Sequence, residues 1–91
     1  MKMITKEQAM SMDWRTELHA GECVTHVGPR GGETTRTEAW RVNGKCKVWK
    51  TQPERFELPI KYGLRHYAYV SETNAHLFHL AADCVPTIKN R

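Results

Sequence analysis

The sequence predicts an α+β fold: a single small domain over residues 1–91, with an antiparallel sheet of about four strands, a short N-terminal helix and a C-terminal helix packed on the sheet. Two β-prone runs meet at Asn43-Gly44, the strongest short-range signal for a β-hairpin. Residues 64–70 alternate in the manner of a half-buried strand. Residues 72–82 place apolar side chains at helical spacing.

The first expected element is a helix that begins after Thr5. Gln8 follows Thr5 by three residues, which matches a capping box. The helix is expected to end near Asp13 and to present a narrow apolar stripe of Ala9, Met10 and Met12. Residues 14–19 then alternate, which predicts a strand. Residues 23–27 form another β-prone run, and the glycine-rich residues 28–32 predict a connecting loop with Arg30 at its tip.

The central predicted element is a hairpin over residues 38–51. A two-residue type I′ turn at Asn43-Gly44 would place Trp40 opposite Lys47. Alternation then gathers both tryptophans and several cations on one face: Arg36, Trp40, Lys45, Lys47 and Trp49. Two interpretations remain open. The indoles either pack in the core, which the scarcity of other large residues favours, or form a stacking platform for single-stranded nucleic acid.

The second half of the chain supplies the edge of the sheet, its last strand and the closing helix. Pro53 and Pro59 cannot donate to a ladder, so residues 52–59 are expected to cross an edge rather than form a central strand. Residues 64–70 place Arg65, Tyr67 and Tyr69 on one side, either as a binding surface or under the closing helix. That helix, over residues 72–82, would carry Glu72 in its first turn. The ordered core is expected over residues 4–86, with a frayed tail at 87–91.

Composition narrows the possible partners and locations. The net charge of +4 favours acidic partners, but ten acidic residues are interleaved with fourteen basic ones, unlike the concentrated charge of many nucleic-acid binders. No apolar run is long enough to span a membrane, so no membrane partner is expected. Three cysteines do not complete a disulfide framework, which favours a cytoplasmic location.

Two short motifs resemble halves of a zinc site. Cys23-x-x-His26 has suitable spacing, and His79 and Cys84 supply two further ligand types. The halves are far apart in sequence, so the expectation is no cofactor, with zinc as the alternative. No motif brings a nucleophile and a base together, and the protein is therefore not expected to be an enzyme.

Several segments resemble, in order, small uncharacterised proteins encoded by actinobacteriophages: residues 27–32, 38–45, 49–53, 56–64 and 78–84. The resemblance covers about residues 22–84. It departs at Gln52, where the pattern has an arginine. The resemblance implies a phage protein working in a bacterial host cytoplasm, and it assigns no activity or binding residue.

Two functional hypotheses follow. The first is a non-catalytic accessory protein that binds and modulates a bacterial host protein. The alternative is a nucleic-acid-binding accessory protein that uses the Trp/Lys face of the hairpin. The candidate binding residues for either function are Arg30, Arg36, Trp40, Lys45, Lys47, Trp49, Arg65, Tyr67 and Tyr69.

Overall fold

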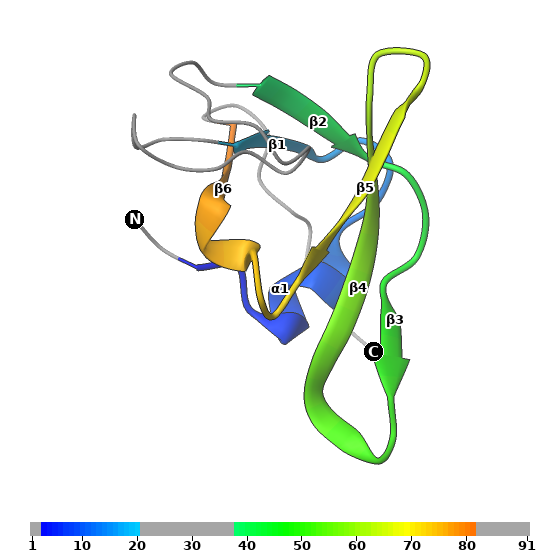
Figure 1. Cartoon of the computed structure of the whole chain (residues 1–91), viewed down its shortest axis with the longest axis vertical. Coiled ribbons are helices and arrows are strands. Elements are labelled where there is room, and N and C mark those ends of the chain that lie inside the picture. The colour runs from blue at the N-terminus through cyan, green and yellow to red at the C-terminus, as the bar shows by residue number, and fades with distance from the viewer. Residues whose placement is uncertain (1–2, 21–37, 82–91) are drawn as a thin grey trace.

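The structure, a computed structural model, describes residues 3–20 and 38–81 (Figure 1). Within these ranges it is mostly antiparallel sheet with little helix. The elements are α1 (Lys6–Ser11), β1 (Glu17–Ala20), β2 (Glu38–Val42), β3 (Lys47–Trp49), β4 (Gln52–Tyr62), β5 (His66–Ser71), the 3₁₀-helix η1 (Ala75–Leu77) and β6 (Phe78–Leu80). The expected strand at 23–27, the loop at 28–32 and the tail lie outside the described residues. No helix in the described ranges has the length and apolar character needed to cross a membrane.

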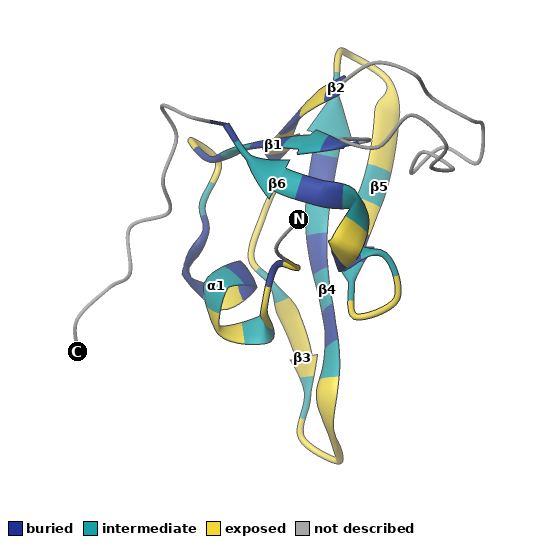
Figure 2. Cartoon of the chain, turned by 90° about the vertical axis from the view of Figure 1, so that its left-hand side faces the viewer, coloured by how far each residue is buried: buried dark blue, intermediate teal, exposed yellow. Residues whose placement is uncertain are grey.

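The sheet has six strands, rather than about four, and is organised around β4. β5 pairs with β4 from Glu57 to Tyr62. Because a strand has only two edges, β2 at Lys61 and β3 at Glu57 must both use the edge opposite β5. β2 and β3 therefore lie end to end along β4. β1 pairs with β2 and β6 pairs with β1, which extends the sheet into a half-barrel (Figures 1 and 2).

The predicted hairpin at Asn43-Gly44 is wrong, because β2 and β3 each pair with β4 and not with one another. The Asn43 N–H donates to the Pro59 carbonyl at 2.8 Å. A type I′ turn needs positive φ at both central residues. In the described part of the chain, Gly44 at +137° and Gly63 at +64° are the residues with positive φ. The local turn signal is overridden because a long strand offers pairing to both runs.

The interpretation of residues 52–59 as an edge crossing is also wrong, since they begin the longest strand and pair on both sides. The two prolines lie where the ladder is interrupted. Pro59 faces the 43–46 connection, where it needs to supply only its carbonyl. Near Pro53 the pairing jumps from Val48–Phe56 to Trp49–Gln52, so residues 53–55 have no partner residue in β3. A proline is tolerated at such irregularities.

The expected helix at 72–82 is wrong for its described residues, which form a turn, η1 and β6. Ala75 and Phe78 are buried, as the helical stripe predicted, but Phe78 and Leu80 pair with β1 instead. Glu72 accepts a hydrogen bond from the Phe56 N–H at 3.1 Å. Hydrogen bonds from its own N–H and from that of Phe56 lower the pKa of the Glu72 carboxyl. Glu72 therefore links the turn after β5 to β4. It does not lie in the first turn of a helix, as the sequence predicted.

A side chain from the same turn covers part of the free edge of β5. The Asn74 amide accepts from the Ser71 N–H at 2.8 Å and donates to the Tyr69 carbonyl at 2.9 Å. One amide group thus satisfies the two main-chain groups that a further strand would bond. The end of β5 is pinned to the turn that leads into η1.

Predictions based on local signals are largely confirmed. The Thr5 side chain accepts from the Gln8 N–H and the Gln8 side chain from the Thr5 N–H, which completes the capping box. The helix ends at Ser11, slightly before the expected Asp13. A strand follows, although it begins only at Glu17. The last predicted strand is β5, shifted to His66–Ser71.

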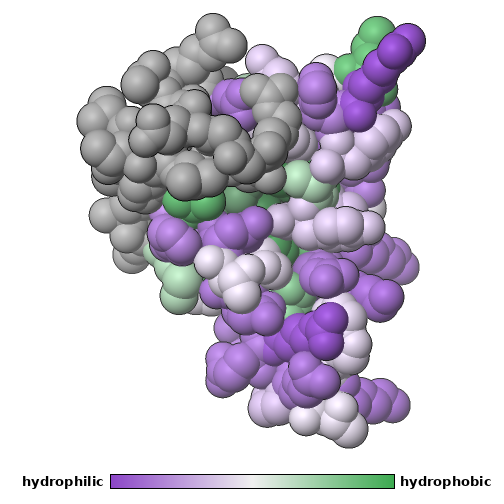
Figure 3. Space-filling view, in the orientation of Figure 1, coloured by the Kyte–Doolittle hydropathy of each residue, from purple (hydrophilic) through white to green (hydrophobic). Residues whose placement is uncertain are grey.

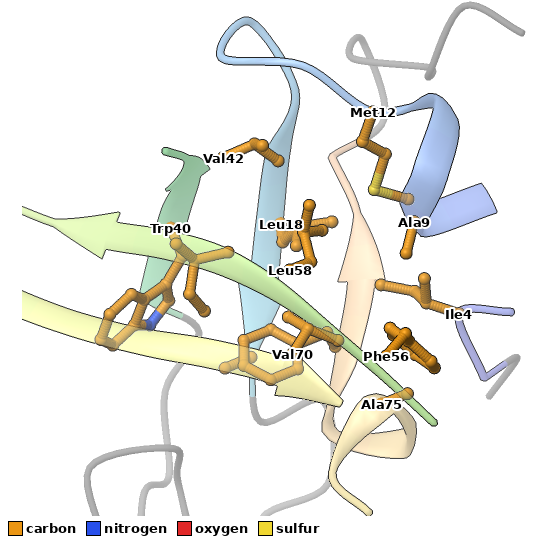
Figure 4. Close-up of a cluster of buried hydrophobic side chains, with 13 residues drawn as sticks. Ile4, Ala9, Met12, Leu18, Trp40, Val42, Phe56, Leu58, Val70 and Ala75 are labelled. Atoms are coloured by element: carbon orange, nitrogen blue, oxygen red, sulfur yellow. The ribbon is translucent and has the colours of Figure 1, made fainter. Parts of the chain in front are cut away.

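The core lies on the inner face of the half-barrel and is closed by the N-terminal segment (Figure 4). β4 alternates in burial from Arg55 to Lys61, whereas its first three residues are exposed (Figure 2). Trp40 is fully buried, and its indole N–H donates to the buried Glu38 carboxylate at 3.4 Å. The buried apolar side chains that form this cluster are Ile4, Ala9, Met12, Leu18, Ala20, Trp40, Val42, Phe56, Leu58, Ile60, Val70, Ala75 and Phe78.

Gly44→Asn should destabilise the protein by about 2–3 kcal/mol, because φ of +137° is nearly restricted to glycine and an added Cβ would lie 3.0 Å from Pro59 Cγ. Gly63→Asn is the matched control. Its φ of +64° is one that Asn adopts, and a Cβ there meets no atom within 4 Å. Chemical denaturation measures both losses, and a greater loss at Gly63 would contradict the structure.

Candidate binding face

The side chains that point away from the core gather on one surface, because cross-strand partners share a face of a sheet. Alternation places Glu57, Pro59 and Lys61 of β4 opposite the buried Phe56, Leu58 and Ile60. Pro59 and Lys61 then lie beside Tyr69 and Tyr67 of β5. We call this surface the outer face; its residues include Glu17, Arg41, Lys47, Trp49, Arg55, Glu57, Pro59, Lys61, Tyr67 and Tyr69. Mostly hydrophilic residues cover β3 and the lower part of β4 (Figure 3).

An indole on the outer face lies close to two cations. The Arg55 Cζ is 3.9 Å from the centroid of the Trp49 ring, and the Lys47 Nζ is 5.3 Å from it. Both distances suit cation–π interaction, which contributes about 0.5–1 kcal/mol at exposed sites. The half-buried Trp49 is held by these contacts, so a flat aromatic surface and two charges are fixed together on β3 and β4.

Two tyrosines form the second part of the outer face. Tyr67 and Tyr69 are 63% and 55% exposed. The Lys61 Nζ lies 5.4 Å from the centroid of the Tyr67 ring. Tyr67 and Tyr69 are on the same side of β5, as alternation predicted, and no closing helix covers them within the described chain.

The structure brings some of the predicted binding residues together and separates others. Lys47, Trp49, Tyr67 and Tyr69 share the outer face. Trp40 lies in the core and is not available for stacking. Lys45 lies in the 43–46 connection and Arg65 in the turn between β4 and β5, both exposed. Arg30 and Arg36 lie outside the described residues.

Sequence reasoning missed Arg41, Arg55 and Lys61. The signal for the last two was present, because the large apolar residues Phe56, Leu58 and Ile60 occupy every second position between Arg55 and Lys61. Pro53 and Pro59 predicted an edge crossing at residues 52–59, whereas the alternation predicts the strand that forms. Arg41 is the polar neighbour of Trp40 in β2, and only the long-range pairing of β2 with β4 places it beside Lys61.

Of the proposed zinc ligands, only His79 belongs to the described part. It pairs with His19 across β6 and β1, and their ring centroids are 5.5 Å apart. Cys23, His26 and Cys84 lie outside the described residues. Among residues 3–20 and 38–81, no group of three or more His, Cys, Asp or Glu side chains could hold a metal ion. Cys46 is half-buried, and burial raises the pKa of its thiol.

Comparisons of the chain with protein-family models, with curated proteins and with solved structures find no match.

Trp40→Ala should destabilise the protein by about 3–5 kcal/mol, because it empties a fully buried site. Trp49→Ala should also destabilise, but by only about 1 kcal/mol, since the indole is half-buried and held by two cation–π contacts. Trp14→Ala, at a site 64% exposed, is the matched control and should change stability by less than about 0.5 kcal/mol. Urea denaturation measures all three variants. Equal losses at Trp40 and Trp49 would contradict the burial described here.

Proposed function

We propose that this protein is a non-catalytic accessory protein whose outer face binds and modulates a bacterial host protein. The observation that carries the proposal is the exposure of Tyr67 and Tyr69 on the same sheet face as the Trp49–Arg55 stack. Tryptophan, tyrosine and arginine are the residues most enriched at binding hot spots.

The rigidity of the outer face supports the proposal. Its aromatic side chains project from paired strands, and Trp49 is further held by Arg55 and Lys47. The strands that carry these side chains are already paired, so little backbone freedom remains to be lost on binding, which favours affinity. Both charge signs occur on the face, with Glu57 on the strand that also carries Lys61, as in a surface that matches a protein partner of mixed charge.

The assignment of the partner to a bacterial host rests on the sequence resemblance over residues 22–84 to actinobacteriophage proteins. A cytoplasmic location is part of the same proposal and agrees with the low cysteine content.

The second candidate function is nucleic-acid binding, because Trp49 and the two tyrosines lie beside Lys47, Arg55 and Lys61. Two observations favour a protein partner. The burial of Trp40 removes one of the two indoles of the expected stacking platform. Glu57 and Glu17 place negative charge on the outer face, where a phosphate chain would need an uninterrupted track of cations.

Affinity capture from an actinobacterial lysate, with and without nuclease, tests the proposal. A stoichiometric protein partner should survive nuclease and should be lost, by at least about tenfold, with the double variant Tyr67→Ala/Tyr69→Ala. Trp14→Ala removes a similarly exposed aromatic side chain from the turn before β1, which is not among the outer-face residues named above, and it should leave capture unchanged.

Recovery of nucleic acid alone would instead support the second candidate. Binding through Arg41, Lys47, Arg55 and Lys61 would then weaken with salt, with a log–log slope of about −3 at roughly 0.7–0.9 per neutralised phosphate. Capture of a protein that is indifferent to the tyrosine variant would contradict the role given to the outer face.

A further inference from the structure

Four residues on the outer face form one row across four strands. Glu17 of β1 is the cross-strand partner of Arg41 in β2, Arg41 that of Lys61 in β4, and Lys61 that of Tyr67 in β5. Directly opposed side chains in an antiparallel sheet are close enough to interact. The row therefore reads, from β1 to β5, as an anion, two cations and an aromatic ring.

The outer members of the row each hold one cation. Arg41 Nη2 is 3.1 Å from Glu17 Oε1, and the two side chains are 53% and 31% exposed. Lys61 Nζ lies over the Tyr67 ring at 5.4 Å. At the centre of the row, Arg41 and Lys61 are cross-strand partners of like charge, and such a pairing is unfavourable by itself.

A pocket opens at this point. It has a volume of about 410 Å³ and is lined by Glu17, Arg41, Lys61, Asn43, Ala39 and Gly63, among others. Ala39 and Gly63 contribute little side-chain volume, and a Cβ built on Gly63 would meet no atom within 4 Å. Small residues beside the row thus leave space next to the two cations.

We propose that the Arg41–Lys61 pocket receives a carboxylate side chain from an acidic segment of the protein partner. The inference rests on the proposed function for the nature of its occupant. An incoming carboxylate would accept hydrogen bonds from the guanidinium and the ammonium group and would relieve their repulsion. Glu17 competes for Arg41, so it sets how tightly the pocket holds an anion.

The pocket fits one or two carboxylates better than a nucleic-acid backbone. It offers two cations and already contains the Glu17 carboxylate, so its net charge is only +1. Glu57 extends the negative charge along β4 on the same face. A sugar-phosphate backbone that continued from the pocket along β4 would be repelled by the Glu57 carboxylate. A protein segment with isolated acidic residues need not follow β4.

The test is an NMR titration of the full chain with blocked hexaglutamate in 0.15 M NaCl, where exposed charges beyond about 8 Å are screened. The backbone amides of Gly63 and Asn43 should shift and saturate, and hexaglutamine should leave them unchanged. Arg41→Gln and Lys61→Gln should each weaken affinity about 3- to 5-fold, as expected for exposed charge pairs. Glu17→Gln should strengthen affinity by about the same factor, because it frees Arg41.

Two variants control for net charge alone. Lys50→Gln, in the turn between β3 and β4, and Glu54→Gln, near the start of β4, alter exposed charges and should each change affinity by less than about 1.5-fold. Equal effects of these controls and the pocket variants would overturn the proposal, as would shifts that avoid Gly63 and Asn43. Tighter binding of inorganic phosphate or of an oligothymidylate at the same amides would overturn the assignment to a carboxylate. Failure of the lysate capture would leave the titration valid, so the two proposals fail separately.

Discussion

The alternation of side chains along β4 is the constraint on which the described structure depends. Phe56, Leu58 and Ile60 supply the middle of the core, and the intervening residues supply the middle of the outer face. Both edges of the same strand are occupied, by β5 on one side and by β2 and β3 on the other. A slip of β4 by one residue would exchange its two faces, and it would also separate Lys61 from Tyr67 and Glu57 from Lys47. Core packing and the arrangement of the candidate site therefore both depend on how β4 is aligned with its neighbours.

The predictions from sequence succeeded for elements that are stabilised by interactions between residues close together in the chain. The capping box at Thr5 and Gln8 and the alternation that became β5 depend on residues a few positions apart. They failed where a distant strand decides the outcome. A proline is excluded from a ladder only where its N–H would be needed, and that depends on which strand lies beside Pro59. Asn43-Gly44 connects two strands that pair with a third, and Phe78 fits both a helical stripe and the short strand β6.

In the candidate site too, the groupings that depend on neighbouring residues were predicted and those that depend on strand pairing were not. The sequence grouped Lys47 with Trp49 and Tyr67 with Tyr69, because each pair lies two residues apart in one strand. It placed Trp40 and Trp49 together on one face of a hairpin that does not form, so it treated both indoles as core or both as a stacking platform. Trp40 faces the core because its strand lies between β1 and β4, whereas Trp49 lies on the short outermost strand beside β4. The row from Glu17 to Tyr67 combines residues from four strands and requires every register to be known.

The Asn74 amide on the edge of β5 has a consequence for how the protein meets other molecules. A strand with a free edge is a template for intermolecular pairing, which leads to aggregation or to recognition by strand addition. Because Asn74 already occupies the Tyr69 carbonyl and the Ser71 N–H, an extended chain pairing with the first half of β5 would have to displace it to continue. The Asn74 amide thus blocks strand addition at the end of β5, whose edge is otherwise unpaired in the described chain. In the proposed binding mode, recognition at β5 depends on the phenol side chains, which can discriminate among partners in a way that main-chain pairing cannot.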